Sequence, residues 1–318
     1  MNVTPEITEY FGWLSTYPKR TFFYEFSAHR TYDTDESAYD SQYNITPLDF
    51  HSGKLVIEML DSVAPELTGI CLEIGCGTGR LTAGLLQSAR FERHLITDAS
   101  EKFLTLTHKK LMDTGVDIAT SDFGLFNGDD FNELGFDRFA LIALRSVIHH
   151  ITDYRTFFTA LTSKLKPGGV IAALEPRAEF FLMTSIILGF LPHMAAQQGA
   201  PLTESELGHI RIFEAASRFY LDRKLDKSLG EDKYAFATEE LTALASDNGL
   251  VLYRMGGEYK QSFADDFFDY LKYCMSFPDT FVEKVRKLCL SHVQKVDDLL
   301  KDLHTINAAE WLLFRKVK

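Results

Sequence analysis

Three glycines follow a short apolar run near residue 70 and alternate with other residues. The run covers residues 70–74, and the turn after it reads Gly75-Cys76-Gly77-Thr78-Gly79. Glycines at this spacing let the backbone come close to a ligand and let a helix start tightly after a strand. A dinucleotide fingerprint places its third glycine one residue later, where Arg80 stands, and a phosphate cradle needs a Gly-Lys-Ser/Thr ending. The turn therefore predicts a ligand site of neither class.

An acidic side chain stands near the end of each of the first two predicted strands. Glu73 precedes the glycine turn, and Asp98 follows the apolar run 94–97, roughly 20 residues after Gly79. An acid at the end of the second strand can accept hydrogen bonds from two ribose hydroxyls. Capping of the following helix is the alternative role for Asp98, and a partnership with a helix N-terminus is the alternative for Glu73.

Two adjacent histidines follow the predicted strand at 138–144. Neighbouring residues in a helical turn point about 100 degrees apart, so at most one of His149 and His150 is expected to reach a bound substrate. We expect one of them to act as a base, with His150 preferred, and a structural role is the alternative. Arg145 lies nearer the strand end, where it could hold a carboxylate or lie at the surface.

Glu175 follows the predicted strand at 170–174, and Arg177 stands two residues further on. Because parallel strands end at one edge of a sheet, both residues are expected to face the same site as the histidines. A role in handling the substrate is expected for Glu175, and an ion pair with Arg177 is the alternative. The cysteines show no spacing typical of zinc, so no metal is predicted.

Strand and helix signals alternate between residues 70 and 175, which predicts βαβ units and a doubly wound parallel α/β sheet. The stretches 176–237 and 257–308 are expected to be helical inserts in a domain over 51–318, and residues 1–50 a helical or lid segment. Ligands of open α/β sheets bind at the carboxyl ends of the strands, so these three additions are expected to form a cap over the site. The expected strands are 70–74, 94–97, 116–120, 138–144, 170–174, 250–254 and 310–316.

These motifs together resemble the class I S-adenosylmethionine-dependent methyltransferases, in their small-molecule branch. Residues 73–79 are similar to motif I of that family, and Asp98 stands where the family has its ribose-binding acid. Ser121-Asp122-Phe123 resembles the place where an Asp caps the adenine amino group and the next residue packs on the ring. The segments 146–151 and 165–169 resemble those after the family's fourth strand and before its fifth.

The resemblance implies a Rossmann-like sheet of seven strands in the order 3-2-1-4-5-7-6. It also implies S-adenosylmethionine as cofactor, S-adenosylhomocysteine as product, and in-line attack of the acceptor on the methyl carbon while the protein orients the reactants and removes water. The residues predicted to bind the cofactor are Glu73, Gly75, Cys76, Gly77, Thr78, Gly79, Asp98, Ala99, Asp122, Phe123, Arg145 and Tyr43. The residues predicted to be catalytic are His150, His149 and Glu175.

Apolar and aromatic residues gather in the three additions to the sheet. Residues 10–32 are dense in aromatic side chains, and the runs 180–188 and 263–273 are also largely apolar. A lid over the acceptor and simple packing against the core are the two interpretations of the first segment. The runs in the inserts favour a bulky, largely apolar acceptor, with methylation of oxygen, nitrogen or carbon left open.

Composition narrows the partners and the compartment. The 318 residues carry a net charge of −12, which argues against a nucleic-acid partner. The first residues lack a signal-peptide pattern and the four cysteines favour a reducing compartment, so a cytoplasmic protein is expected. The apolar stretch 180–196 contains Gly189 and Pro192 and favours a buried or lid helix over stable membrane insertion. A protein methyltransferase and a non-catalytic cofactor-binding protein are the alternatives, and the oligomeric state is left open.

Overall fold

The computed structural model describes residues 4–27, 48–259, 262–300 and 306–317. The chain forms two compact units. The first, which we call the sheet unit, comprises residues 1–174, 242–255 and 312–318. The second, the helical unit, comprises residues 175–241 and 256–311.

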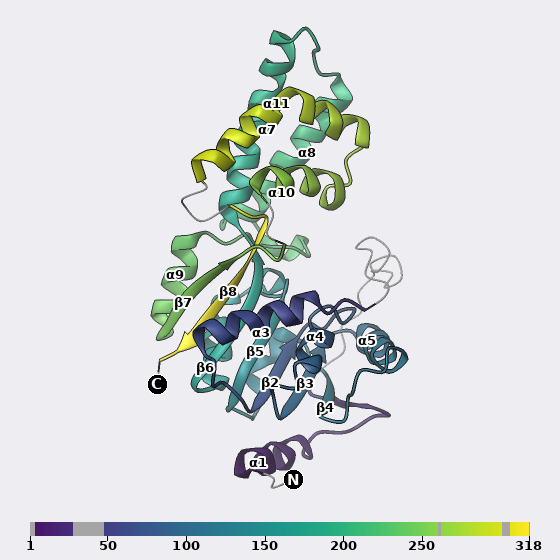
Figure 1. Cartoon of the computed structure of the whole chain (residues 1–318), viewed down its shortest axis with the longest axis vertical. Coiled ribbons are helices and arrows are strands. Elements are labelled where there is room, and N and C mark those ends of the chain that lie inside the picture. Colours follow the sequence, from purple (N-terminus) through teal and green to yellow (C-terminus); the bar gives the residue numbers. More distant parts are fainter. Residues whose placement is uncertain (1–3, 28–47, 260–261, 301–305, 318) are drawn as a thin grey trace. The chain divides into compact units, whose positions relative to one another are not determined.

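A sheet in the order β1-β4-β3-β2-β5-β6-β8-β7 forms the core of the sheet unit (Figure 1). The five neighbouring pairs from β1 to β6 are all parallel, so the predicted doubly wound α/β sheet is confirmed. Without β1, the order is the predicted 3-2-1-4-5-7-6. The strands are β1 (Phe23–Glu25), β2 (Ile70–Ile74), β3 (Arg93–Asp98), β4 (Ser121–Leu125), β5 (Phe139–Arg145), β6 (Leu165–Pro176), β7 (Leu250–Gly256) and β8 (Ala309–Lys316).

The number of strands differs from the prediction, because β1 adds an eighth strand beside β4. Phe23 pairs with Phe123 and Glu25 pairs with Leu125, both in parallel register. Three residues are too short a run to show strand periodicity in a sequence. The strand depends instead on its pairing with β4 and on the burial of Phe23, which is 3% exposed.

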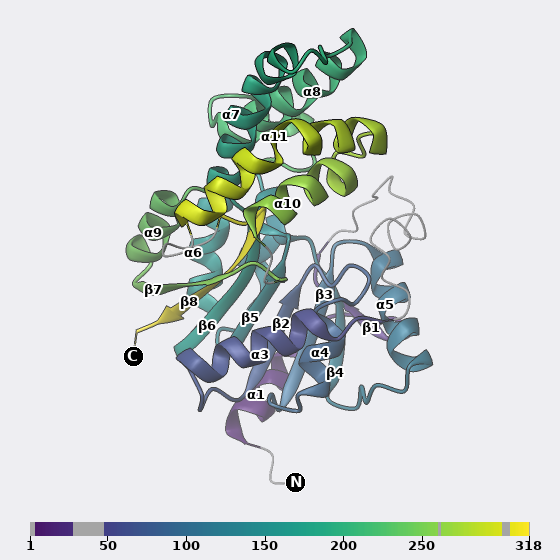
Figure 2. The same ribbon diagram turned by 45° about the horizontal axis from the view of Figure 1, so that its top comes forward.

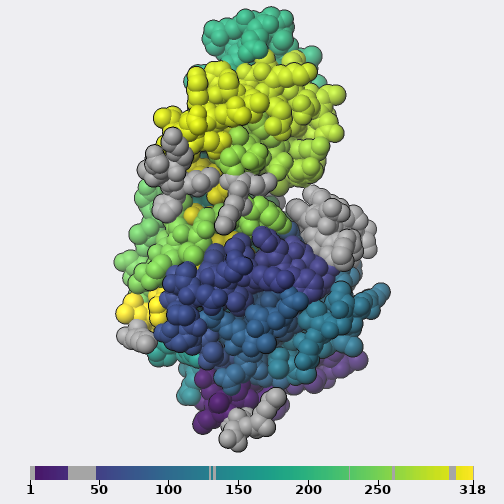
Figure 3. All heavy atoms as spheres, viewed as in Figure 1, coloured from purple at the N-terminus to yellow at the C-terminus, as the bar shows by residue number. Residues whose placement is uncertain are grey.

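Helices cover both faces of this sheet, which explains why its central strands are apolar along their whole length. On one face lie α3 (His51–Val63), α4 (Thr82–Gln87) and α5 (Glu101–Asp113), whose side chains cover that face (Figures 1 and 3). On the other lies α6 (Tyr154–Lys164) (Figure 2). The sheet unit also contains α1, described below, the short η1 (Gly128–Glu133) and η2 (Ile148–His150), and part of α9 (Thr238–Asp247).

Helix α1 (Pro5–Leu14) packs at the amino ends of the strands. Glu9 forms an ion pair with Arg138, just before β5, with the two charged atoms 2.8 Å apart. The fully buried Tyr10 donates its hydroxyl proton to Asp122, near the start of β4, over 3.0 Å. Of the two interpretations of the aromatic N-terminal segment, packing against the core describes α1, because the glycine turn lies at the opposite ends of the strands.

The third strand was predicted at 116–120, and that position is wrong. The strand is β4, at Ser121–Leu125, and its Asp122 pairs in register with Leu95 within β3. Val116 and Ile118 alternate with polar residues, as in a half-buried strand, but they are only partly buried and pack from a loop against the core. Asp122 therefore lies inside the sheet near the amino end of its strand rather than after it.

The helical unit is built from α7 (Ala178–Gln197), α8 (Glu204–Leu221), α10 (Phe263–Asp269) and α11 (Asp279–Leu300) (Figure 2), with the short η3 (Lys227–Leu229) and the π-helical η4 (Tyr270–Cys274). Its core includes Phe181 and Leu188 of α7 and Phe267 of α10. Among the described residues α7 is the one helix long and apolar enough to cross a membrane, and 39% of its most apolar window is buried.

Candidate functional site

The glycine turn connects β2 to α4 through backbone conformations that side chains disfavour. Gly75, Gly77 and Gly79 have φ values of +73°, +52° and +88°. A Cβ atom at Gly75 would lie 2.7 Å from Cγ2 of Val147, so a methyl group there has no room. At Gly77 the same atom would meet none of the described residues within 4 Å, so no described side chain covers this backbone. A ligand can therefore approach this backbone closely.

Asp98, the last residue of β3, fastens this turn to the start of α5. Its Oδ2 accepts a hydrogen bond from the backbone N–H of Gly77, and its Oδ1 accepts one from Ser100, each over 2.8 Å. Burial raises the pKa of Asp98 to about 6, although the N–H groups of Ser100, Gly77 and Ala99 act in the opposite direction. Ser100 caps α5, because its hydroxyl accepts a hydrogen bond from the N–H of Phe103.

Two further polar groups of the turn are buried. Glu73 on β2 is 3% exposed and accepts a hydrogen bond from the hydroxyl of Thr82 over 3.0 Å, and burial raises its pKa to about 8. The hydroxyl of Thr78 is buried and has no hydrogen-bond partner among the described residues. Such a group costs free energy unless a ligand or water satisfies it. Burial also raises the pKa of the Cys76 thiol well above its usual range, which keeps it protonated.

Asp122 and Phe123 lie away from this edge, which corrects their predicted contact with adenine. Asp122 accepts hydrogen bonds from Tyr10 and, over 2.7 Å, from the guanidinium of Arg93 in an ion pair. Phe123 is 3% exposed and packs in the core against Phe22 and His108. Both side chains thus make contacts within the sheet unit: Asp122 in an ion pair and a hydrogen bond, and Phe123 in the core.

The segment that does follow β4 is Phe126-Asn127-Gly128, which sequence reasoning missed. Phe126 donates its backbone N–H to the carbonyl of Asp98 over 2.8 Å, so this segment lies beside the end of β3. The signal was present, because Asn127-Gly128 is a turn pair at the end of the apolar run 123–126.

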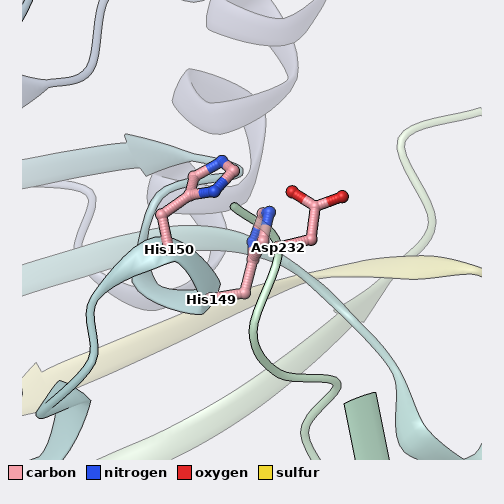
Figure 4. A group of neighbouring side chains, drawn as sticks. All are labelled: His149, His150 and Asp232. Atoms are coloured by element: carbon pink, nitrogen blue, oxygen red, sulfur yellow. The ribbon is translucent and has the colours of Figure 1, made fainter. Parts of the chain in front are cut away.

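The two histidines lie on η2, the short turn after β5 (Figure 4). His149 is buried and His150 is half-buried. Their ring centroids lie 4.1 Å apart and the ring planes are inclined by 41°. The side chains therefore do not diverge as in a regular helix, and both imidazoles stay near the carboxyl end of β5.

Arg145 and Glu175 stand at the ends of neighbouring strands. Arg145 is the last residue of β5 and is half-buried; its register partner on β6 is Leu174, which directly precedes Glu175. Glu175 is 1% exposed. Arg177 forms ion pairs with Glu310 and Glu179, each over 3.2 Å, inside the helical unit. Tyr43, also predicted to contact a cofactor, lies outside the described residues.

Comparison with known proteins assigns the part of the chain that contains the glycine turn and the histidines to a protein family. Residues 72–171 match the family model described as a methyltransferase domain, and the match includes the glycine turn, Asp98 and both histidines. Residues 72–171 are therefore a methyltransferase domain, and the sheet that contains them has the fold of S-adenosylmethionine-dependent methyltransferases. A methyltransferase of this cofactor class from Clostridium acetobutylicum shares the fold, with a TM-score of 0.50, 14% identity, and coverage of 89% of this chain and 97% of that one.

The curated proteins that the chain matches are synthases much longer than this chain. The chain is 31% identical over 155 residues to the reducing polyketide synthase Preu2 of Preussia isomera, a match that spans 48% of this chain and 6% of that protein. It is 30% identical over 146 residues to the hybrid synthetase iliA of Neonectria sp., spanning 41% of this chain and 3% of that protein. The chain thus matches only a small part of the length of these relatives.

Proposed function

We propose that the chain transfers the methyl group of S-adenosylmethionine to a small organic acceptor. The observation that supports this most directly is the pairing of Asp98 with the bare backbone of Gly77 at the carboxyl edge of β2 and β3. A carboxylate can accept about four hydrogen bonds, so Asp98 retains acceptor capacity for the ribose hydroxyls of the cofactor. The hydroxyl of Thr78 in the same turn has no partner among the described residues, which also fits a polar ligand.

The other cofactor contacts that we propose come from residues around this turn. The buried carboxyl of Glu73 would face the ammonium end of the cofactor, and a cation there would favour its ionised form. The backbone from Gly75 to Gly79, which includes Cys76, would line the cofactor with Ala99. Arg145 would hold the cofactor carboxylate. The segment after β4, not Asp122, would approach the adenine ring.

We propose further that the acceptor atom is an acidic carbon between two carbonyl groups. The chain's relatives are, by their names, polyketide synthases, and a polyketide intermediate offers such a carbon. Its proton must leave as the new bond forms, and His150 at the end of β5 is the proposed base. The acceptor carbon bonds to the methyl carbon, the carbon–sulfur bond breaks, S-adenosylhomocysteine leaves, and the acceptor proton moves to the imidazole.

Glu175 is the second catalytic group that we propose. It is the last residue but one of β6, which pairs with β5, and it is almost fully buried. Its carboxyl group would help to handle the acceptor during the transfer. The proposal does not require a metal ion.

Calorimetric titration of the purified chain tests the cofactor. We expect micromolar binding of S-adenosylmethionine and S-adenosylhomocysteine and no binding of NAD. Acetoacetyl-N-acetylcysteamine thioester then tests the acceptor, with labelled methyl traced to the α-carbon by mass spectrometry. Binding of NAD in place of the two sulfur compounds would refute the proposed cofactor. Label on oxygen, or on a protein in a lysate but not on the thioester, would refute the proposed acceptor.

A further inference from the structure

We propose that Val147 is a positioning residue that couples the glycine turn to the histidine turn η2, so that a ligand on the first fixes the orientation of His150 on the second. The proposal rests on the function proposed above. Every residue that carries it lies in the sheet unit.

The side chain of Val147 occupies the space beside Gly75. A Cβ atom at Gly75 would lie 2.7 Å from Cγ2 of Val147 and within 4 Å of its other two branch atoms. The isopropyl group therefore packs directly on the backbone of the turn, in the place that a side chain at position 75 would need. Any shift of this backbone must move Val147 or open a gap beside it.

The backbone of Val147 belongs to the histidine turn. Val147 is the residue before η2, and its carbonyl accepts the N–H of His150 over 3.0 Å. One residue thus touches the glycine turn with its side chain and holds the proposed base with its main chain. The two turns are far apart in the sequence and share this contact.

Both turns are fixed on their other sides. The N–H groups of Gly75 and Cys76 both donate to the carbonyl of Thr97 on β3, each over 2.9 Å. On the histidine side, Ser146 donates its N–H to Leu174 of β6 over 2.9 Å and has a φ of +59°, a conformation that non-glycine residues rarely adopt. Such strain persists only where the surroundings hold it, and it is common at functional sites.

Truncation of Val147 should therefore loosen the histidine turn and leave the cofactor contacts in place. The hydrogen bonds of Asp98 and Glu73 do not involve Val147. A shorter side chain removes the contact with Gly75 while both turns keep their anchors on β3 and β6. The expected result is a chain that binds the cofactor but no longer orients His150.

The test compares three valine variants of the full chain. Val147→Ala removes the contact, and Val147→Thr keeps the branched shape. Val116→Ala is the matched control, because Val116 is a half-buried valine of the same unit that packs in the core cluster of Leu104 and Leu111. S-adenosylhomocysteine binding is measured by calorimetry, and the ring signals of the histidines by NMR, with the His150 signal assigned from His150→Gln.

We expect S-adenosylhomocysteine to shift the His150 ring signal in the wild type, in Val147→Thr and in Val116→Ala. In Val147→Ala that shift should fall by at least about half, while the Kd changes by less than about threefold, a small free-energy difference. With the thioester acceptor, kcat should fall about tenfold at an unchanged KM for S-adenosylmethionine, the pattern of a loss confined to the transition state.

The outcomes separate the two proposals. If Val147→Ala binds S-adenosylhomocysteine and keeps the full shift at His150, the coupling is refuted and the proposed function stands. If its affinity falls in proportion to kcat, Val147 serves the cofactor turn alone and the coupling is again refuted. If the wild type binds no S-adenosylhomocysteine, both proposals fail. If Val147→Ala does not unfold cooperatively, Val147→Cys takes its place, because cysteine removes less of the contact with Gly75.

Discussion

Replacement of Asp98 by alanine is the sharpest test of the cofactor site, because its effects on stability and on binding can be worked out separately. The carboxylate accepts one hydrogen bond from Gly77 and one from Ser100. Hydrogen bonds to a charged group contribute about 1.5–3 kcal/mol each, so their loss costs about 3–6 kcal/mol. Burial raises the pKa of Asp98 from 3.8 to about 6, and removal of the acid relieves that penalty, about 3 kcal/mol at pH 7.

The net destabilisation of Asp98→Ala is therefore only about 0–3 kcal/mol, and the middle of that range lowers the Tm by roughly 5 °C in a unit of this size. Cofactor binding should fall much further, because two ribose hydroxyls lose a charged partner at about 1.5–3 kcal/mol each, or about a hundredfold or more in Kd. Calorimetry with S-adenosylhomocysteine and thermal unfolding measure the two effects, with Asp113→Ala at the exposed end of α5 as control. A Kd within about threefold of the wild type would refute the ribose contact.

Four further predictions concern single side chains. Burial raises the pKa of Glu73 to about 8, so the folded state holds a proton that the unfolded state loses, and the stability of the chain falls as the pH rises from about 4.5 to 8. Glu73→Gln should remove this pH dependence. In urea unfolding at pH 8, the variant should be more stable than the wild type by roughly 2–5 kcal/mol. His150→Ala should keep S-adenosylhomocysteine binding but lower kcat about a hundredfold, and an unchanged rate would make the histidine structural. Gly75→Ala should lower stability by about 1–3 kcal/mol in thermal unfolding, because of its positive φ and its approach to Val147. Tyr10→Phe should cost about 1–2 kcal/mol through the lost hydrogen bond to Asp122 while the Kd of S-adenosylhomocysteine stays unchanged, since α1 lies at the other edge of the sheet.

The sequence was sufficient to predict the strands that are buried on both faces and the turns that follow them. The run from Ile70 to Ile74 is apolar apart from Glu73, and it ends in glycines that only a tight turn requires. Ser100 stands at a helix start with the residue type that caps helices. In both places the structure that the local residue pattern favours is also the structure in the folded chain, so the local pattern was enough to predict it.

Asp122 shows where local patterns fail. The preceding segment, residues 116–120, alternates apolar and polar residues as a strand does, whereas β4 itself begins with two polar residues and contains Gly124. What places Asp122 inside the sheet is its pairing with Arg93 and with Tyr10, which stands 112 residues away in the sequence. No short-range signal reports such contacts, so the motif was assigned to the wrong end of the strand.

The two roles considered for Asp98 are compatible, and this follows from counting its acceptor positions. Oδ1 accepts the N–H of Ser100 at the start of α5, which is the structural role, and Oδ2 accepts the N–H of Gly77 in the ligand-binding turn. The N–H of Ala99 and the thiol of Cys76 also act on this carboxylate, so ribose hydroxyls would share its roughly four acceptor positions with these groups. Asp98→Asn keeps one acceptor oxygen, but its NH2 group would face the other backbone N–H. An amide NH2 cannot accept a hydrogen bond from that N–H. The asparagine variant should therefore weaken cofactor binding nearly as much as alanine does, because the ribose needs acceptors on both sides of the group.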